Sequence, residues 1–170
     1  MPHIETNVFP DQINFSTVQQ TLPPNYIIRP LRSNDFDKGF SQLLSQLTDI
    51  GDLSAQNFQD RFHEMLAMPG TYYIIVIENT TTQKLVASGS LILEKKFIHG
   101  NGLAGHIEDI VVDEKERGNS LGKKLIEQLR LTAIQLNCYK VILDCHEKTV
   151  GFYEKCGFKV KGVQMAYYKE

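Results

Sequence analysis

The sequence has little of what marks several large classes of protein. It contains no apolar run near the roughly 20 residues that span a bilayer, so we expect no membrane span. Its opening segment, MPHIETNVF, has neither a basic nor a strongly apolar stretch, and we expect no secretory signal. The net charge is only −2, which argues against nucleic-acid binding through a broad basic face. What remains is a chain of 170 residues, 42% of them hydrophobic, which is enough for one domain with a buried core.

Cysteine is also scarce. The three residues, Cys138, Cys145 and Cys156, are an odd number and form neither a CxxC motif nor a Cys/His spacing typical of a metal site. This pattern argues against a disulfide framework and offers no set of metal ligands. We therefore expect reduced thiols in a cytoplasmic protein that holds no metal.

Repeats and low-complexity tracts are absent as well, so the chain divides only near its start. Residues 1–24 are polar, lack periodicity and end in Pro23-Pro24. We predict that they form an N-terminal arm that is either flexible or packed on the domain. Residues 25–170 then form a single domain.

The rest of the chain alternates between β-branched runs and amphipathic stretches with helical spacing. Strands are predicted at 26–29, 71–78, 85–94, 104–112, 139–145 and 158–168, the fifth of them buried; helices are predicted around 36–47, from Ser54, at 118–136 and at 150–156. A hairpin turn is predicted at 79–83 and a loop at 95–102. Antiparallel strands come first and a βαβα order follows, which predicts an α/β fold with helices on the faces of a mixed sheet.

A turn at the start of the helix predicted at 118–136 has the composition of a phosphate site. Arg117, Gly118 and Gly122 lie where free backbone N–H groups and the helix dipole favour an anion. Glycine lets an anion approach the backbone closely, and Arg117 and Lys123 add positive charge. Glycine-rich helix starts are common, so this turn alone does not establish phosphate binding. The GxGxxG and GxxxxGK[ST] patterns are absent, which leaves the dinucleotide fingerprint and the P-loop without support.

Several motifs follow one another in a specific order. The pattern R-x-x-[small]-x-G spans Arg117 to Gly122, and G-F-Y-E-K-C-G-F spans Gly151 to Phe158; K-F-I-H (96–99), G-H-I-E-D-I (105–110) and C-Y-K-V-I-L-D-C (138–145) complete the set. Together these motifs resemble the GNAT family of N-acetyltransferases from about residue 26 to residue 169, and within it the members that acetylate glucosamine 6-phosphate for UDP-N-acetylglucosamine synthesis. The resemblance implies the GNAT fold, a mixed and mostly antiparallel sheet flanked by helices on both faces.

The resemblance also implies acetyl-CoA as co-substrate, bound around the end of the 104–112 strand and the turn that follows it. The residues that it assigns to this site are Ile110, Val111, Val112, Arg117, Gly118, Asn119, Ser120, Leu121, Gly122, Lys123, Tyr153 and Lys155. Ser120 stands where the family usually has glycine. We expect the backbone at Ser120 either to avoid a positive φ or to accept strain.

Acetylation of an amine by a thioester needs a base for the ammonium, a donor for the developing oxyanion and a proton for the leaving thiolate. The resemblance implies Glu108 as the base, directly or through water, and Asp109 as a ligand of the sugar hydroxyls or the amine. It places Asp144 against the amine and gives Tyr153 the role of proton donor to sulfur. Adjacent strand residues face opposite ways, so Glu108 and Asp109 share one site only if the strand is bulged there, as it is in the family. The bulge also frees the backbone N–H of Ile110 to bind the thioester carbonyl.

Each of these residues has an ordinary structural explanation that the sequence leaves open. An acidic pair in a strand often lies at an exposed edge or in a salt bridge. Asp144 is also placed to cap the following helix. Tyr153 is alternatively a core aromatic residue, as we expect Phe152 beside it to be.

For the sugar phosphate, the resemblance implies contacts from loops and strand ends. It assigns Thr48, Lys96, Phe97, Ile98, His99, Glu108, Asp109, Lys140, Asp144 and Tyr168. An isolated lysine more often simply faces solvent, and His106 has the pattern of a packed or surface histidine. Tyr168 stands where the family has an arginine that contacts the phosphate, and Thr149 where many members have asparagine.

We expect a homodimer, because members of the family pair through the region corresponding to Gly162 to Tyr168 and complete each other's sugar site. We expect direct transfer in a ternary complex rather than through a thiol of Cys145 or Cys156, since Cys145 follows a strand predicted to be buried. Two other functions stay open. One is acetylation of another amine, such as a peptide or polyamine, and the other is non-catalytic binding of acetyl-CoA.

Overall fold

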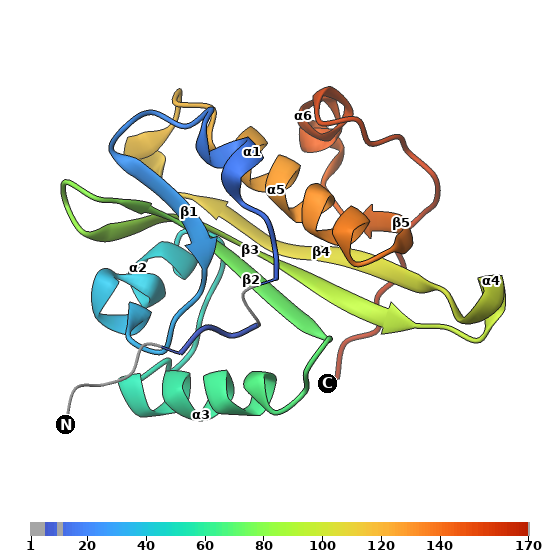
Figure 1. Cartoon of the computed structure of the whole chain (residues 1–170), viewed down its shortest axis with the longest axis horizontal. Coiled ribbons are helices and arrows are strands. Elements are labelled where there is room, and N and C mark those ends of the chain that lie inside the picture. Colours follow the sequence, from blue (N-terminus) through green and yellow to red (C-terminus); the bar gives the residue numbers. More distant parts are fainter. Residues whose placement is uncertain (1–5, 10–11, 170) are drawn as a thin grey trace.

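A five-stranded sheet forms the centre of the structure, a computed structural model that describes residues 6–9 and 12–169 (Figure 1). Its strands lie in sequence order: β1 (Tyr26–Pro30), β2 (Tyr72–Asn79), β3 (Lys84–Lys95), β4 (Leu103–Val112) and β5 (Cys138–Leu143). The first four strands pair antiparallel, whereas β5 pairs parallel to β4. A parallel pair needs a crossover connection, and a helix supplies it here. The prediction of a mixed, mostly antiparallel sheet with helices on its faces is confirmed.

Helices connect the strands and cover the sheet. The α-helices are α1 (Ser16–Gln19), α2 (Phe40–Leu44), α3 (Ala55–Leu66), α4 (Ile98–Asn101), α5 (Leu121–Gln135) and α6 (Val150–Lys155), and the 3-10 helices are η1 (Asp35–Lys38), η2 (Glu114–Glu116) and η3 (Glu147–Thr149). Figure 1 shows α5 lying across the sheet beside α1, with α2 and α3 grouped away from them. Among the described residues, no helix combines the length and the apolar character needed to cross a membrane.

Helix α5 packs its predicted apolar stripe against the sheet. Leu121 is 1% exposed, and Leu125 and Leu129 are fully buried. Gly89 of β3 permits this close approach, because a Cβ at that position would lie 3.0 Å from Leu129 Cδ1. Each buried leucine of this kind contributes about 1.5–3 kcal/mol to folding. The packing holds the N-terminus of α5 beside the end of β4.

The N-terminal arm packs on the domain wherever the structure describes it. Val8, Phe9 and Val18 are 4%, 3% and 0% exposed. The backbone N–H of Asn14 donates to Gln135 Oε1 at 3.2 Å, which joins the arm to the end of α5. The described part of the arm therefore belongs to the packed structure, and the rest of the predicted arm lies outside the described residues.

A buried cluster of charges ties η1 to the sheet. Arg29 donates to both carboxylate oxygens of Asp35 at 2.8 Å, and its Nη2 lies 2.6 Å from Glu78 Oε2. Lys38 Nζ lies 2.7 Å from the other oxygen of Glu78. Burial acts to raise the pKa of Glu78, but the hydrogen bonds and charges of Lys38 and Arg29 together outweigh it and lower that pKa. The cluster fixes η1, and with it the start of α2, on β1 and β2.

Two segments between strands differ from their prediction. The single helix predicted around 36–47 is divided into η1 and α2, because Gly39 has a φ of 86° that interrupts the helix. The loop predicted at 95–102 contains α4, although His99 and Gly100 have left-handed backbone angles within it. Glycine adopts such angles without a Cβ penalty, which explains the break at Gly39.

The last two predicted strands also differ. The sequence predicts a buried β5, but Tyr139 and Ile142 are 40% and 38% exposed, because β5 is the outer strand of the sheet. The sequence predicts a strand at 158–168, but in the described structure this segment is extended without strand pairing. A strand needs a neighbour for its N–H and C=O groups. Figure 1 shows the segment running from α6 along the outside of the molecule to the C-terminus.

Candidate active site

The site lies where the two parallel strands β4 and β5 separate. Their pairing ends at Ile107 and Leu143, whereas β4 continues to Val112. Glu108 is the next residue of β4, and Asp144 immediately follows the last residue of β5. The parallel register therefore brings their carboxyl groups to the same opening. Burial first, and then the charges of the neighbouring acidic groups, raises the pKa of Glu108, while His106 acts to lower it.

A β-bulge turns Glu108 and Asp109 to the same opening. Ser90 of β3 pairs with Glu108 and Ser88 pairs with Val111, so two residues of β4 lie opposite the single residue between the two serines. Asp109 has a φ of 53°, and both residues reach solvent at this point of the sheet, so the burial that raises the pKa of Glu108 is partial. The bulge that the family resemblance implies is therefore present.

The residue of β3 opposite the bulge is Gly89, which the sequence prediction of the site did not include. A Cβ at Gly89 would lie only 2.5 Å from Ile110 Cδ1, so any other residue would displace the Ile110 side chain. An isolated glycine inside a predicted strand is a known sign of a bulge or of a close approach of another chain segment. That sign was available in the sequence.

Asp144 and Tyr153 lie on the segments that follow β5. The 3-10 helix η3 begins at Glu147 with His146 as its N-cap residue, so Asp144 is not the capping residue of that helix. Tyr153 of α6 is half-buried, with its ring centroid 6.3 Å from that of Phe158. Burial, followed by the neighbouring cysteine thiols, raises the pKa of the Tyr153 phenol.

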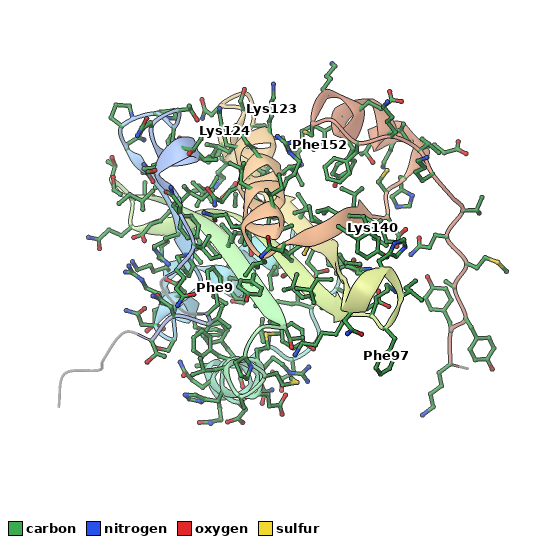
Figure 2. All side chains as sticks on the ribbon, turned by 45° about the vertical axis from the view of Figure 1, so that its right-hand side comes forward. Phe9, Phe97, Lys123, Lys124, Lys140 and Phe152 are labelled. Atoms are coloured by element: carbon green, nitrogen blue, oxygen red, sulfur yellow. The ribbon has the colours of Figure 1, made fainter. Side chains whose placement is uncertain are left out.

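Two predictions about the neighbours of Tyr153 are wrong. Phe152 is not a core residue, because it is 38% exposed and lies against the first turn of α5, where a Cβ at Gly122 would be 3.4 Å from its ring (Figure 2). Cys145 is not buried, because β5 is an outer strand and ends before it. Cys156 is partly buried, and burial raises the pKa of its thiol.

The turn at 117–122 leads from η2 into α5 and is exposed from Arg117 to Ser120. The helix begins at Leu121 rather than at Gly118, because Gly118 and Ser120 both have positive φ values, of 96° and 58°. Ser120 occupies the N-cap position, and within the described structure its side chain makes no capping hydrogen bond. The N–H groups at the start of this 15-residue helix, with Arg117 and Lys123 beside them, fit an anionic group such as a diphosphate.

The strain at Ser120 leads to a stability prediction. We expect Ser120→Gly to raise the free energy of unfolding by about 0.5–1 kcal/mol, because the left-handed penalty of about 1–2 kcal/mol exceeds the entropy cost of glycine. Chemical denaturation would measure this. The matched control is Ser45→Gly, at an exposed serine with a φ of −63°, where glycine should lower stability instead. A lower stability for Ser120→Gly would contradict the assigned strain.

A second polar cluster lies at the far end of β3 and β4. Glu94 binds both Lys96 and His106, the latter with 2.7 Å between Oε2 and Nε2. These hydrogen bonds, that from Lys96 first, lower the pKa of Glu94. His106 is thus a hydrogen-bond partner of Glu94, and the sequence prediction did not include Glu94 among the polar residues at this end of the sheet.

Of the other residues assigned to the sugar, His99 and Lys140 lie together against Tyr139, whereas Phe97 and Ile98 face solvent. The ring of His99 lies 4.3 Å from that of Tyr139, and Lys140 Nζ lies 5.6 Å from the Tyr139 centroid. Phe97 and Ile98 are 98% and 61% exposed, and Figure 2 shows Phe97 pointing away from the body of the molecule near α4.

Thr48 and Tyr168 also lie apart. Thr48 is exposed after α2, and Tyr168 is 83% exposed in the C-terminal segment.

Within the described ranges, no group of three or more His, Cys, Asp and Glu side chains is arranged to hold a metal ion.

Comparisons with known proteins identify relatives of this chain. The chain matches the acetyltransferase (GNAT) family over residues 38–158. It is 49% identical over 140 residues to glucosamine 6-phosphate N-acetyltransferase 1 of Dictyostelium discoideum, with 82% of this chain and 88% of that protein covered. It is 47% identical over 147 residues to the glucosamine 6-phosphate N-acetyltransferase of Arabidopsis thaliana, covering 86% and 99% of the two chains.

Solved structures give the same picture of the fold. The crystal structure of glucosamine-6-phosphate N-acetyltransferase from Arabidopsis thaliana superposes with a TM-score of 0.83 at 46% identity, covering 85% of this chain and 99% of that one. An acetyltransferase structure from Trypanosoma brucei gives a TM-score of 0.77 at 36% identity, with the same coverage of 85% and 99%.

Proposed function

From the premise that this chain belongs to the acetyltransferase (GNAT) family, we propose that it acetylates the amine of D-glucosamine 6-phosphate, with acetyl-CoA as co-substrate, to give N-acetyl-D-glucosamine 6-phosphate. The observation that carries the proposal is the opening between β4 and β5, where Glu108, Asp109 and Asp144 stand together. The names of the relatives supply the substrate, and the carboxylates supply groups that suit an amine and sugar hydroxyls.

The carboxylates and the phenol have distinct tasks in this proposal. Glu108 takes the proton of the substrate ammonium on a carboxylate oxygen, directly or through water, and its raised pKa makes it a better base than an ordinary glutamate. Asp144 orients the amine and Asp109 binds the sugar. Tyr153 donates its phenolic proton to the departing sulfur. Transfer is direct within a ternary complex, without a cysteine intermediate.

Acetyl-CoA, when bound, supplies an acyl group that its thioester activates for attack by an amine. The chain holds it with the end of β4 and the 117–122 turn. The residues proposed to contact it are Ile110, Val111, Val112, Arg117, Gly118, Asn119, Ser120, Leu121, Gly122, Lys123, Tyr153 and Lys155. The backbone N–H of Ile110, beside the bulge, donates to the acyl oxygen, and the N–H groups at the start of α5 bind the diphosphate.

We assign the sugar phosphate to Lys96, His99 and Lys140, with Phe97 and Ile98 beside them, and to Thr48 and Tyr168. His99 and Lys140 share Tyr139 as a neighbour, whereas Thr48 follows α2 and Tyr168 lies in the exposed C-terminal segment. A second copy of the chain would bring the C-terminal segment of one subunit to the sugar site of the other. We therefore propose a homodimer with shared sugar sites.

We also propose a cytoplasmic location, which the free cysteines suit because reduced thiols persist there.

The exposed C-terminal segment supports this dimer. Val163, Met165 and Tyr167 are 92%, 93% and 97% exposed, an unusual state for apolar side chains that alternate along an extended chain. A second copy would bury them, and the outer edge of β5 lies free of a strand within the described chain.

The dimer leads to a prediction about two of these side chains. We expect the double variant Val163→Glu and Met165→Glu to weaken dimerisation by at least about tenfold, because buried charges cost more than the apolar contacts they replace. Sedimentation across a dilution series would measure it. The matched control is Gln164→Glu, which adds a charge between them without removing an apolar contact. A wild-type chain that is monomeric and fully active at every concentration would contradict the shared site.

The test of the function itself is thiol release from acetyl-CoA with glucosamine 6-phosphate, with glucosamine and a lysine peptide as controls. We expect release with the sugar phosphate alone. Release with a different amine would move the proposal to another substrate of the same family, and no release with any amine would favour a binding protein.

A further inference from the structure

Glu116 lies immediately before the 117–122 turn, as the last residue of η2, and its carboxylate is surrounded by donors. The hydroxyl of Tyr26 lies 2.5 Å from Oε2, and Asn79 Nδ2 donates to Oε1 at 3.1 Å. Asn119, on the turn itself, donates from Nδ2 to Oε2 at 3.4 Å and to the Tyr26 hydroxyl at 3.3 Å. One carboxylate thus connects the turn to two strands of the sheet.

The two strand residues that hold Glu116 are themselves fixed. Tyr26 and Asn79 lie directly opposite each other in the β1–β2 register and are 5% and 6% exposed. Asn79 Oδ1 accepts the backbone N–H groups of Thr81 and Thr82 at 3.0 and 3.3 Å, which sets the orientation of its amide. The amide nitrogen of Asn79 is therefore directed at Glu116 by the hairpin turn.

The turn beyond Glu116 has few other constraints. It is exposed from Arg117 to Ser120, two of its residues have positive φ, and the Ser120 side chain makes no capping hydrogen bond within the described structure. An exposed segment of this kind is mobile unless something ties it down. Asn119, near the far end of the turn, donates to the carboxylate of Glu116 at its start. This contact bridges the backbone from Arg117 to Ser120, which is the backbone proposed to bind the diphosphate.

We propose that Glu116 is a positioning residue for acetyl-CoA, which holds the backbone of Arg117 to Ser120 in the conformation that binds the diphosphate; this inference rests on the proposed function. A carboxylate close to an anion site would ordinarily repel the anion. Here Tyr26, Asn79 and Asn119 all donate to the carboxylate, which stabilises it and directs its oxygens toward these donors, and Arg117 beside it supplies a positive charge. The hydrogen bond to Glu116, burial and the charge of Glu116 raise the pKa of the Tyr26 phenol. A raised pKa keeps the phenol protonated, as a donor to the Glu116 carboxylate must be.

The experiment compares Glu116→Gln with the matched control Glu114→Gln, at an exposed glutamate of the same 3-10 helix. Calorimetry gives the Kd of acetyl-CoA, steady-state kinetics gives KM and kcat, and denaturation gives the stability of the free protein. We expect Glu116→Gln to raise both Kd and KM for acetyl-CoA roughly tenfold, with kcat at saturation within about twofold of wild type. Glu114→Gln should change none of them.

Two further variants separate positioning from general stability. Tyr26→Phe keeps the buried ring and removes one donor, so we expect a smaller rise in Kd, of about threefold. Glu116→Asp keeps the carboxylate and should recover part of the lost affinity. The same Kd values in wild type and Glu116→Gln, with only a lower stability, would overturn the inference alone. A wild-type chain that binds no acetyl-CoA would overturn the proposed function and this inference together.

Discussion

Glu108→Gln is expected to lower kcat by about 10²- to 10⁴-fold, because glutamine has the size of the proposed base but takes no proton. Binding of acetyl-CoA should stay close to wild type, since the 117–122 turn and α5 are unchanged. Steady-state kinetics with glucosamine 6-phosphate and calorimetry with acetyl-CoA would measure the two effects. The control Glu147→Gln, at an exposed glutamate in η3, should keep full activity.

The pH dependence of the wild-type enzyme tests the same assignment. A base works when it is deprotonated, so kcat/KM should fall as the pH is lowered through the pKa of Glu108. Burial, Asp109 and Asp144 raise that pKa above the ordinary 4.5, so the fall should begin at a higher pH than for an exposed glutamate. Asp144→Asn removes one of these causes and should move the fall to lower pH. An unchanged acid limb in Glu108→Gln would show that another group or a water chain takes the proton.

Glu108 also affects stability, with a definite sign. Its pKa is raised in the folded state, so the folded state binds more protons than the unfolded state between the ordinary and the raised value. The free energy of unfolding that this glutamate contributes therefore decreases as the pH rises through that interval. Glu108→Gln should be slightly more stable than wild type above it, as is expected for a site residue that serves function at a cost in stability.

Asp35→Asn is expected to lower the free energy of unfolding by about 3–5 kcal/mol, which is the usual cost of breaking a buried ion pair by removing one partner. Asp35 is fully buried and accepts two bonds from Arg29, so the variant leaves a buried guanidinium with Glu78 as its remaining carboxylate partner in the cluster. Chemical denaturation would measure the loss. The control is Asp37→Asn, at an exposed residue of the same 3-10 helix, which should change stability by less than about 0.5 kcal/mol.

The pH dependence of this cluster has the opposite sign to that of Glu108. The pKa of Glu78 is lowered in the folded state, so its contribution is fully present above the ordinary carboxyl pKa of 4.5 and is lost as the pH falls through the lowered value. Acid should therefore destabilise the wild-type protein through Glu78. A loss near zero for Asp35→Asn would mean that solvent reaches Arg29 and that the cluster contributes little.

The sequence was a good guide wherever local pattern and packing agree. The stripe of Leu121, Leu125 and Leu129 predicted both the helix and its buried face, and the β-branched and aromatic run at 71–78 predicted a strand that is buried along nearly its whole length. The order of motifs led to the family resemblance, which implied the bulge at Glu108 and Asp109 that β4 contains. In α5, for example, the leucines whose spacing predicts the helix are the same residues that pack it against the sheet.

The two errors about strands have a common physical cause, which is that a strand pattern does not state what lies beside the strand. The run from Tyr139 to Leu143 has the composition of a buried strand, but it forms the outer edge of the sheet. Residues 158–168 have strand composition without a neighbour in the single chain. The role of Glu116 was equally hidden, since its partner Tyr26 is 90 positions away in sequence.

The bond between Asn14 and Gln135 has a consequence for the order of folding. The two residues are 121 positions apart, so during synthesis the arm is made long before the helix end that receives it. At about 5–20 residues per second, the arm waits roughly 6–24 seconds for Gln135 to be made. Other contacts of the arm need only earlier segments, since the backbone N–H of Val8 donates to the carbonyl of Leu31 and the ring of Phe9 lies 4.9 Å from that of Tyr73. The arm thus packs in two stages, first beside β1 and β2 and then, through Asn14, on the end of α5 once that helix is complete.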